Sequence, residues 1–280
     1  MPAAVLAILL LTPLAVSSVS AAVRPANPPI NPCEPAVVRG ISPLCGGGGP
    51  GGAKNPCGSP TYLYASAYDN DNYSIYGINT TQAIYSQTVC GTDGVANFVT
   101  VYFPQTCVAP NGAWTYAELS IGYFEGPAGG TTNKMYRSPE YYYDEFTPSG
   151  SGHFSSCKYV FSVLAPAPVG SSASFQMQAA GTASNKWSLS IAGVVSVTGV
   201  TAAQSHGWTA GANLESHSAA DVATAYFSSL ADFAAPVDSC PGSWFPWSSS
   251  YTQRLPNDGT NPYQIMQNSA NSFSMWTGSR

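Results

Sequence analysis

The chain has 280 residues, of which only 8% are charged, and its formal net charge at pH 7 is -5. Since about 25% of the residues of an average soluble protein are charged, the surface of this chain must consist largely of uncharged polar side chains and glycine. Its nine Lys and Arg residues argue against nucleic acid as a partner, because binding to phosphate backbones depends on clustered positive charge.

The chain begins with a segment that is typical of protein export. Residues 1–22 read MPAAVLAILLLTPLAVSSVSAA, an apolar run that ends in small residues, with Val19 and Ala21 placed as the small pair before a cleavage site. This pattern predicts a secretory signal peptide, and the run is too short to span a bilayer comfortably. We therefore expect a secreted, extracellular protein that has no membrane contact after cleavage.

Residues 23–60 are dominated by Pro and Gly. Such a composition buries too little apolar surface to offset the entropy cost of ordering the chain. We therefore predict a linker or propeptide at 23–60, followed by one β-sandwich domain at 61–280.

Seven cysteines in an exported chain predict up to three disulfides. Cys90 and Cys107 flank the run VANFVTVYF, so we expect these two to tie neighbouring strands together. The sequence contains no CxxC pair and no His at zinc-finger spacing from a cysteine, which argues against a zinc site.

From Tyr62 onward, short runs rich in Tyr, Val, Phe, Thr and Ile alternate with clusters of Gly, Pro, Asn and Asp. This pattern predicts strands and turns. Only at 219–231 is a helical turn an alternative to a strand. Many short strands without βαβ alternation indicate an all-β fold, an antiparallel double-sheet β-sandwich of the concanavalin-like jelly-roll type. The expected strands are 62–68, 73–78, 95–103, 114–125, 140–147, 158–165, 172–178, 186–191, 194–201, 208–215, 222–230 and 271–277.

The predicted strand 114–125, WTYAELSIGYFE, has two different faces, because successive side chains of a strand point to opposite sides. Ala117, Leu119, Ile121 and Tyr123 form an apolar face that we expect in the core. Solvent faces of antiparallel sheets are normally polar, so large rings on the other face favour a substrate-binding surface over an ordinary outer face with an exposed acid. That face carries Trp114, Tyr116, Glu118, Ser120, Gly122 and Phe124.

A second acidic strand is predicted at 208–215, WTAGANLE. Glu215 shares a face with Thr209, Gly211 and Asn213, whereas Trp208 falls on the opposite face with Ala210, Ala212 and Leu214. If this strand lies beside 114–125 with the same face outward, Glu118 and Glu215 form a carboxylate pair. Two close carboxylates push their pKa values apart and so supply one acid and one base. Two unrelated surface acids are the alternative.

Two further groups of residues have competing interpretations. Glu145, in the aromatic run 141–146, is either a third acid on the same face or a solvated acid near a turn. Trp244, Trp247 and Tyr251, in WFPWSSSY, form either a sugar-stacking platform or ordinary core packing.

Several short stretches resemble one family of enzymes. NKWSLSIAG at 185–193, followed by WTAGANLES at 208–216, resembles the C-terminal half of neprosin-type glutamic peptidases, where a GNWWL-like strand precedes a WGGEV-like strand with a catalytic Glu. SIGYF at 120–124 is similar to the IEAGW stretch of neprosins and to the LQTGV stretch of the eqolisin glutamic peptidases, and YYYDEF at 141–146 is similar to the aromatic strand that follows. The resemblance covers about residues 110–230.

The resemblance implies an endopeptidase with an acid optimum, a polypeptide substrate and no metal or other cofactor. Glu215 takes the place of one catalytic carboxylate, while Ser120 stands where the family has its other catalytic Glu or Gln. Glu118, two residues earlier on the same face, is the candidate replacement, and without it the chain resembles an inactive relative. The expected substrate-binding residues are Trp114, Tyr116, Ser120, Phe124 and Asn213. The alternative function is a secreted, non-catalytic module that binds carbohydrate or cell-wall glycan.

Overall fold

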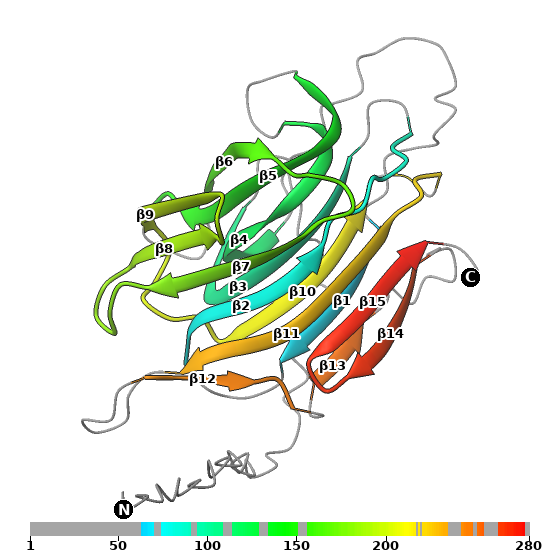
Figure 1. Cartoon of the computed structure of the whole chain (residues 1–280). Coiled ribbons are helices and arrows are strands. Elements are labelled where there is room, and N and C mark those ends of the chain that lie inside the picture. The colour runs from blue at the N-terminus through cyan, green and yellow to red at the C-terminus, as the bar shows by residue number, and fades with distance from the viewer. Residues whose placement is uncertain are drawn as a thin grey trace, which may run out of the picture.

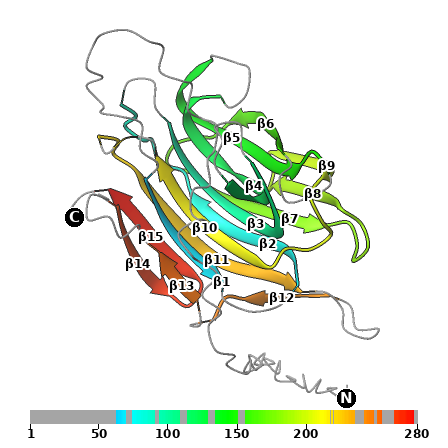
Figure 2. The same cartoon turned by 180° about the vertical axis from the view of Figure 1, so that it is seen from behind.

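A computed structural model describes residues 63–69, 74–90, 94–108, 114–128, 134–150, 156–216, 218, 220–234, 242–248, 251–254 and 263–277. The predicted signal peptide and the Pro/Gly-rich segment at 23–60 lie outside these residues. Two antiparallel sheets are stacked face to face, as Figures 1 and 2 show from opposite sides.

The first sheet has seven strands, and every neighbouring pair in it is antiparallel. In spatial order its strands are β13 (Tyr251–Arg254), β1 (Leu63–Asp69), β10 (Thr209–Ser216), β3 (Val95–Val108), β4 (Trp114–Pro127), β5 (Met135–Pro148) and β6 (Cys157–Pro166). β3 therefore lies between β10 and β4, which places the two acidic strands in one sheet but not side by side.

The second sheet has eight strands and is also antiparallel. Its main path is β14 (Tyr263–Ser269), β15 (Ser272–Thr277), β11 (Thr224–Ala234), β2 (Ile75–Ala83), β7 (Ser172–Ala179), β8 (Lys186–Ile191) and β9 (Val195–Thr201), and β12 (Ser243–Pro246) pairs with β11 outside this path. Figures 1 and 2 both show its edge strand β9 and the neighbouring β8 close to β5 and β6 of the first sheet.

The structure confirms the all-β sandwich, and each of the twelve predicted strands has a counterpart. Sequence reasoning missed β12, β13 and β14, and the competing helical turn at 219–231 is wrong because most of that segment belongs to strand β11. Over the described part of the chain, no helix is long and apolar enough to cross a membrane.

The core lies between the two sheets and follows the period-2 pattern of the strands. The predicted apolar face of β4 is buried in it, and so are Ala210, Ala212 and Leu214 of β10. Aromatic side chains contribute the largest buried volumes to the same core: Phe103, Tyr123, Tyr141, Phe175, Trp187, Phe227, Tyr263 and Phe273.

One disulfide with described partners joins Cys107 near the end of β3 to Cys157 at the start of β6, across 50 residues of sequence. Cys107 is disulfide-bonded, but the expectation that it ties neighbouring strands is wrong, because its partner lies on a strand that is separated from β3 by β4 and β5. A parallel bridge between Val108 and Ser156 lies next to it. Cys90 is disulfide-bonded as well.

Gly122 of β4 lies where the backbone of β3 approaches most closely. A Cβ atom at this position would lie 2.0 Å from the carbonyl oxygen of Asn97 and 2.7 Å from Cα of Phe98. Both of these are backbone atoms, so any side chain at Gly122 forces β3 and β4 apart in the middle of the first sheet.

We expect Gly122→Ala to lower the free energy of unfolding by about 1–3 kcal/mol or more, which is the usual cost of overpacking a dense interior. Urea unfolding measures the change. Gly181→Ala is the control, since a Cβ atom there meets nothing within 4 Å. Equal stability of the two variants would contradict the close approach of β3 and β4.

Candidate functional site

The outer face of the first sheet carries the polar side of β4. Cross-strand pairs align Glu118 with Tyr102, Ser120 with Thr100, and Phe124 with Ala96 of β3. As predicted, Tyr116, Glu118, Ser120 and Phe124 therefore share one face. Trp114 lies at the start of the same strand, but its side chain is outside the described part of the structure.

Asp144 of β5 joins this face. It pairs directly with Ser120, and Glu118 pairs with Phe146 one step further along β5. Glu118 and Asp144 are thus diagonal neighbours on adjacent strands, a spacing at which long side chains interact. The hydroxyls of Ser120 and Thr100 are 3.1 Å apart, which fixes Ser120 beside Asp144.

Glu215 of β10 lies on the same face, two strands away. It pairs with Ala96, which in turn pairs with Phe124 of β4, so its side chain emerges on the side that carries Glu118. The shared face is as expected, but the strands are not neighbours, and Glu118 is aligned with Thr209 rather than with Glu215. We call Glu118, Ser120, Asp144, Asn213 and Glu215 together the acidic face.

The three carboxyl groups are buried, with exposed fractions of 5% for Glu118, 3% for Asp144 and 5% for Glu215. Burial raises the pKa of Glu118 well above its ordinary value, and the negative charges of Asp144 and Glu215 raise it further. Burial also raises the pKa of Asp144 to about 8; a hydrogen bond with Ser120 opposes this rise, and the charges of Glu215 and Glu145 add to it. Glu118 and Asp144 therefore hold their protons to a higher pH than exposed carboxyl groups do.

Two polar atoms of the acidic face have no hydrogen-bond partner. Asn213 accepts a 2.6 Å hydrogen bond from the Ser66 hydroxyl through Oδ1, but its Nδ2 donor is buried and unpaired. Oδ1 of Asp144 is likewise buried and unpaired. Since buried polar atoms normally have partners, these two are free to bind a ligand.

An aromatic cluster borders the acidic face toward β5 and β6. Phe124 packs edge-on against Tyr142 at 5.4 Å, and Tyr142 stacks on Phe161 at 4.9 Å between ring centroids. Phe98 belongs to the same cluster, whereas Tyr136, Phe161 and Val163 are only partly buried. The acidic face therefore has an apolar wall along one side.

Two side chains, Glu145 and Trp208, are not where the sequence analysis expected them. Glu145 pairs with Leu119 and so belongs to the core side of β5, and it is 6% exposed, so both interpretations of it, a third acid of this face and a solvated acid, are wrong. Trp208 precedes β10 and packs on Tyr116 at 5.3 Å instead of joining Ala210 in the core.

Of the predicted sugar platform, Trp247 is 3% exposed, and its Nε1 donates to Oδ1 of Asp232. Trp244 packs on Phe233, and the side chain of Tyr251 lies outside the described residues. Trp247 at least is a core residue, so this platform is not formed.

Asp144 is the site residue that sequence reasoning missed. The run YYYDEF contains two adjacent acids, only one of which can face outward. The pairing register of β4 with β5 decides between them, and a single sequence does not contain that register. No group of three or more His, Cys, Asp or Glu among the described residues is arranged to hold a metal ion.

Comparisons with known proteins give structural similarity alone. No protein-family model and no curated protein matches the chain. A scytalido-glutamic peptidase crystallised with a peptide-based transition state analog matches with a TM-score of 0.46 and 10% identity, over 78% of this chain and 100% of that one. SCP-B, an eqolisin peptidase in complex with the tripeptide Ala-Ile-His, matches with a TM-score of 0.45, 10% identity and the same coverage. An alginate lyase, Aly36B, matches with a TM-score of 0.28 and 12% identity, over 75% of this chain and 70% of that one.

We expect the protein to be more stable in acid than at mildly basic pH. In the unfolded chain Asp and Glu lose their protons near pH 4, whereas the folded protein holds the proton of Asp144 until about pH 8. Between these values the unfolded state binds fewer protons than the folded state, so the free energy of unfolding falls as the pH rises. Thermal unfolding measures this, since each kcal/mol lost lowers Tm by about 2–4 °C in a domain of this size.

Asp144→Asn removes one of the titrating groups and should flatten the dependence of Tm on pH. If this variant loses as much Tm between about pH 4 and pH 8 as the unaltered protein, the titration of Asp144 is not the cause.

Proposed function

We propose that this protein is a secreted acid endopeptidase of the glutamic type, in which the acidic face cleaves the peptide bond. One observation carries the proposal: three buried carboxyl groups from three strands share one face, and burial together with neighbouring negative charges raises the pKa of Glu118 and of Asp144. Pairs of acids whose environments push their pKa values apart supply a general acid and a general base at the same pH.

Glu215 is the proposed general base. Its negative charge contributes to the raised pKa of both Glu118 and Asp144, and in the proposed mechanism it acts as the carboxylate. An ionised carboxylate within hydrogen-bond reach of a water takes one of its protons as the water attacks the scissile carbonyl carbon. The unpaired Nδ2 of Asn213, two residues earlier on the same face of β10, is free to donate to a substrate carbonyl oxygen.

Glu118 is the proposed general acid. Burial and two neighbouring negative charges keep its carboxyl protonated well above its ordinary pKa, so it holds the proton that the leaving nitrogen needs when the C–N bond breaks. In the glutamic peptidases that the sequence resembles, a Glu or Gln stands at the place of Ser120. Here Asp144 pairs with Ser120 from the next strand and has a free Oδ1. The neutral carboxyl group of Asp144, on β5, therefore reaches the position where those peptidases have their Glu or Gln.

A polypeptide substrate is supported by the resemblance of 120–124 and 208–216 to these peptidases. Tyr116 and Phe124, with Trp114 at the start of the same strand, are the proposed contacts for substrate side chains. The aromatic cluster beside Asp144 adds an apolar wall on which such side chains can pack. The rival function, non-catalytic glycan binding through Trp244 and Trp247, loses support because Trp247 is buried in the core.

Digestion of denatured casein between about pH 3 and pH 6 tests the activity. We expect Glu215→Gln and Glu118→Gln each to lower kcat/KM at least about 100-fold, the lower range of what general acid–base catalysis contributes. Glu140→Gln, which alters a partly exposed carboxyl of β5, is the control and should keep its activity. Absence of cleavage by the unaltered protein, or full activity of Glu215→Gln, would refute the proposal.

The pH dependence of the same reaction tests Asp144. We expect kcat to fall as the pH rises past about 8, where Asp144 loses its proton and no longer donates to the substrate. Asp144→Asn keeps an N–H donor that does not titrate, so it should retain part of the activity and lose this basic limb. A basic limb that is identical in Asp144→Asn and the unaltered protein would assign the titration to another group.

A further inference from the structure

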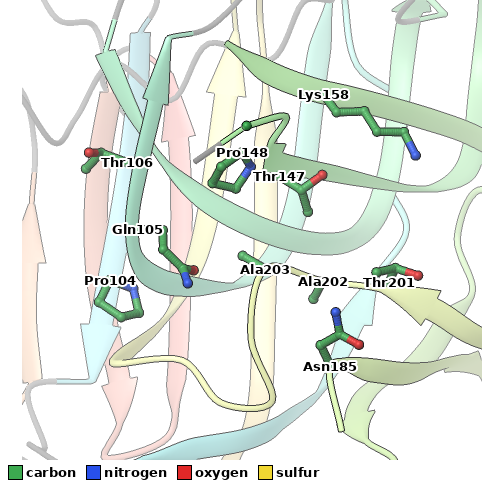
Figure 3. A pocket seen from close by; sticks show the side chains of 11 residues that line it. Pro104, Gln105, Thr106, Thr147, Pro148, Lys158, Asn185, Thr201, Ala202 and Ala203 are labelled. Atoms are coloured by element: carbon green, nitrogen blue, oxygen red, sulfur yellow. The ribbon is translucent and has the colours of Figure 1, made fainter. Parts of the chain in front are cut away.

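A separate cavity of about 660 Å³ lies at the end of the sandwich where β3 bulges and β5 ends. Figure 3 shows it between the ends of these strands, Lys158 of β6, and the segments that flank β8 and β9. Phe146 faces outward, so the next residue of β5, Thr147, faces the inner side of the first sheet. Lys158 pairs with Thr147 and therefore faces the same inner side. The cavity shares no lining residue with the acidic face.

The lining of this cavity suits a ligand rich in hydroxyl groups. Side-chain hydroxyls and amides from four segments converge on it: Gln105, Thr106, Thr147, Asn185 and Thr201. Figure 3 shows Gln105 and Asn185 directed toward its centre. Oε1 of Gln105 is buried and has no hydrogen-bond partner, so it is an acceptor that still needs a donor. The apolar part of the wall consists of Pro and Ala side chains without an aromatic ring.

The charge beside the cavity favours an anion. Lys158 lines it, and Lys186 donates a hydrogen bond to Thr201, which also lines it. Both lysines lower the pKa of the nearby Glu145, which opposes the effect of its burial. Glu145 is 6% exposed and does not line the cavity. Two lysines against one carboxylate leave a surplus positive charge, in a chain whose net charge is -5.

We propose that this cavity binds a saccharide unit that carries a carboxylate, such as a hexuronic acid residue. Its hydroxyls pair with the Thr hydroxyls and the Gln105 and Asn185 amides, and its carboxylate pairs with Lys158. A pyranose ring offers donors and acceptors on all its edges, which matches a lining contributed by several chain segments. An extended acidic peptide would instead need a row of free backbone groups along one strand. The site is independent of the proposed peptidase activity.

Calorimetric titration of the full chain with trigalacturonate tests the proposal, with its methyl ester as the uncharged counterpart and triglutamate as the acidic peptide. We expect trigalacturonate to bind with a submillimolar Kd and the ester to bind at least about tenfold more weakly, a difference of about 1.4 kcal/mol. Lys158→Met and Gln105→Leu should each weaken binding by a similar factor. Lys134→Met, which alters an exposed lysine near Tyr136, should bind like the unaltered protein.

Three results would overturn the proposal. They are no heat of binding at millimolar trigalacturonate, equal affinity for the acid and its ester, and tighter binding of triglutamate than of the sugar. Thermal unfolding of each variant shows whether it is folded. The Glu215→Gln variant should bind trigalacturonate normally, so failure of this site and failure of the proposed catalysis are distinguishable.

Discussion

The burial of carboxyl groups on one sheet face is the constraint on which the candidate site depends. The groups that shift the pKa of Glu118 are burial and two other acids, and for Asp144 they are burial, two acids and the Ser120 hydroxyl. A buried carboxylate without a cation is costly, so the protein lowers that cost by keeping protons on these groups. Any ligand that binds here meets carboxyl groups that hold their protons to a higher pH than exposed ones do.

β3 is the element that turns three separate acids into one face. It pairs with β10 on one side and β4 on the other, so its register sets how Glu215 is placed relative to Glu118. Gly122 allows β4 to approach β3 more closely than a residue with a side chain would, and β5 then brings Asp144 opposite Ser120. The disulfide between Cys107 and Cys157 joins β3 to β6, the two strands that flank β4 and β5, which carry Glu118 and Asp144.

The sequence predicts which face each of these side chains takes but not which strands are neighbours. Alternation in WTYAELSIGYFE is enough to place Glu118 outward and Leu119 inward, because the period of a strand is two whatever it pairs with. Pairing is a property of the whole sheet, so the sequence could not show that β3 separates β4 from β10. The sequence did not identify Asp144 as a site residue for the same reason, since a shift of one residue exchanges the faces of Asp144 and Glu145. The missed strand β13 has only four residues, and β12 contains Pro246, so neither offers a clear alternating pattern.

The low charge of the chain and the raised pKa values of the acidic face have a common consequence. Proteins usually unfold in acid because carboxylates that are paired with cations in the native state take up protons. With only nine Lys and Arg in 280 residues, this chain can form few such pairs, while Glu118 and Asp144 are already protonated in the fold. Lowering the pH therefore disrupts few stabilising ion pairs, and it removes the free-energy cost of burying charged carboxylates. The same protonation that stabilises the fold is the one that the proposed general acid needs, so stability and activity should favour the same pH range.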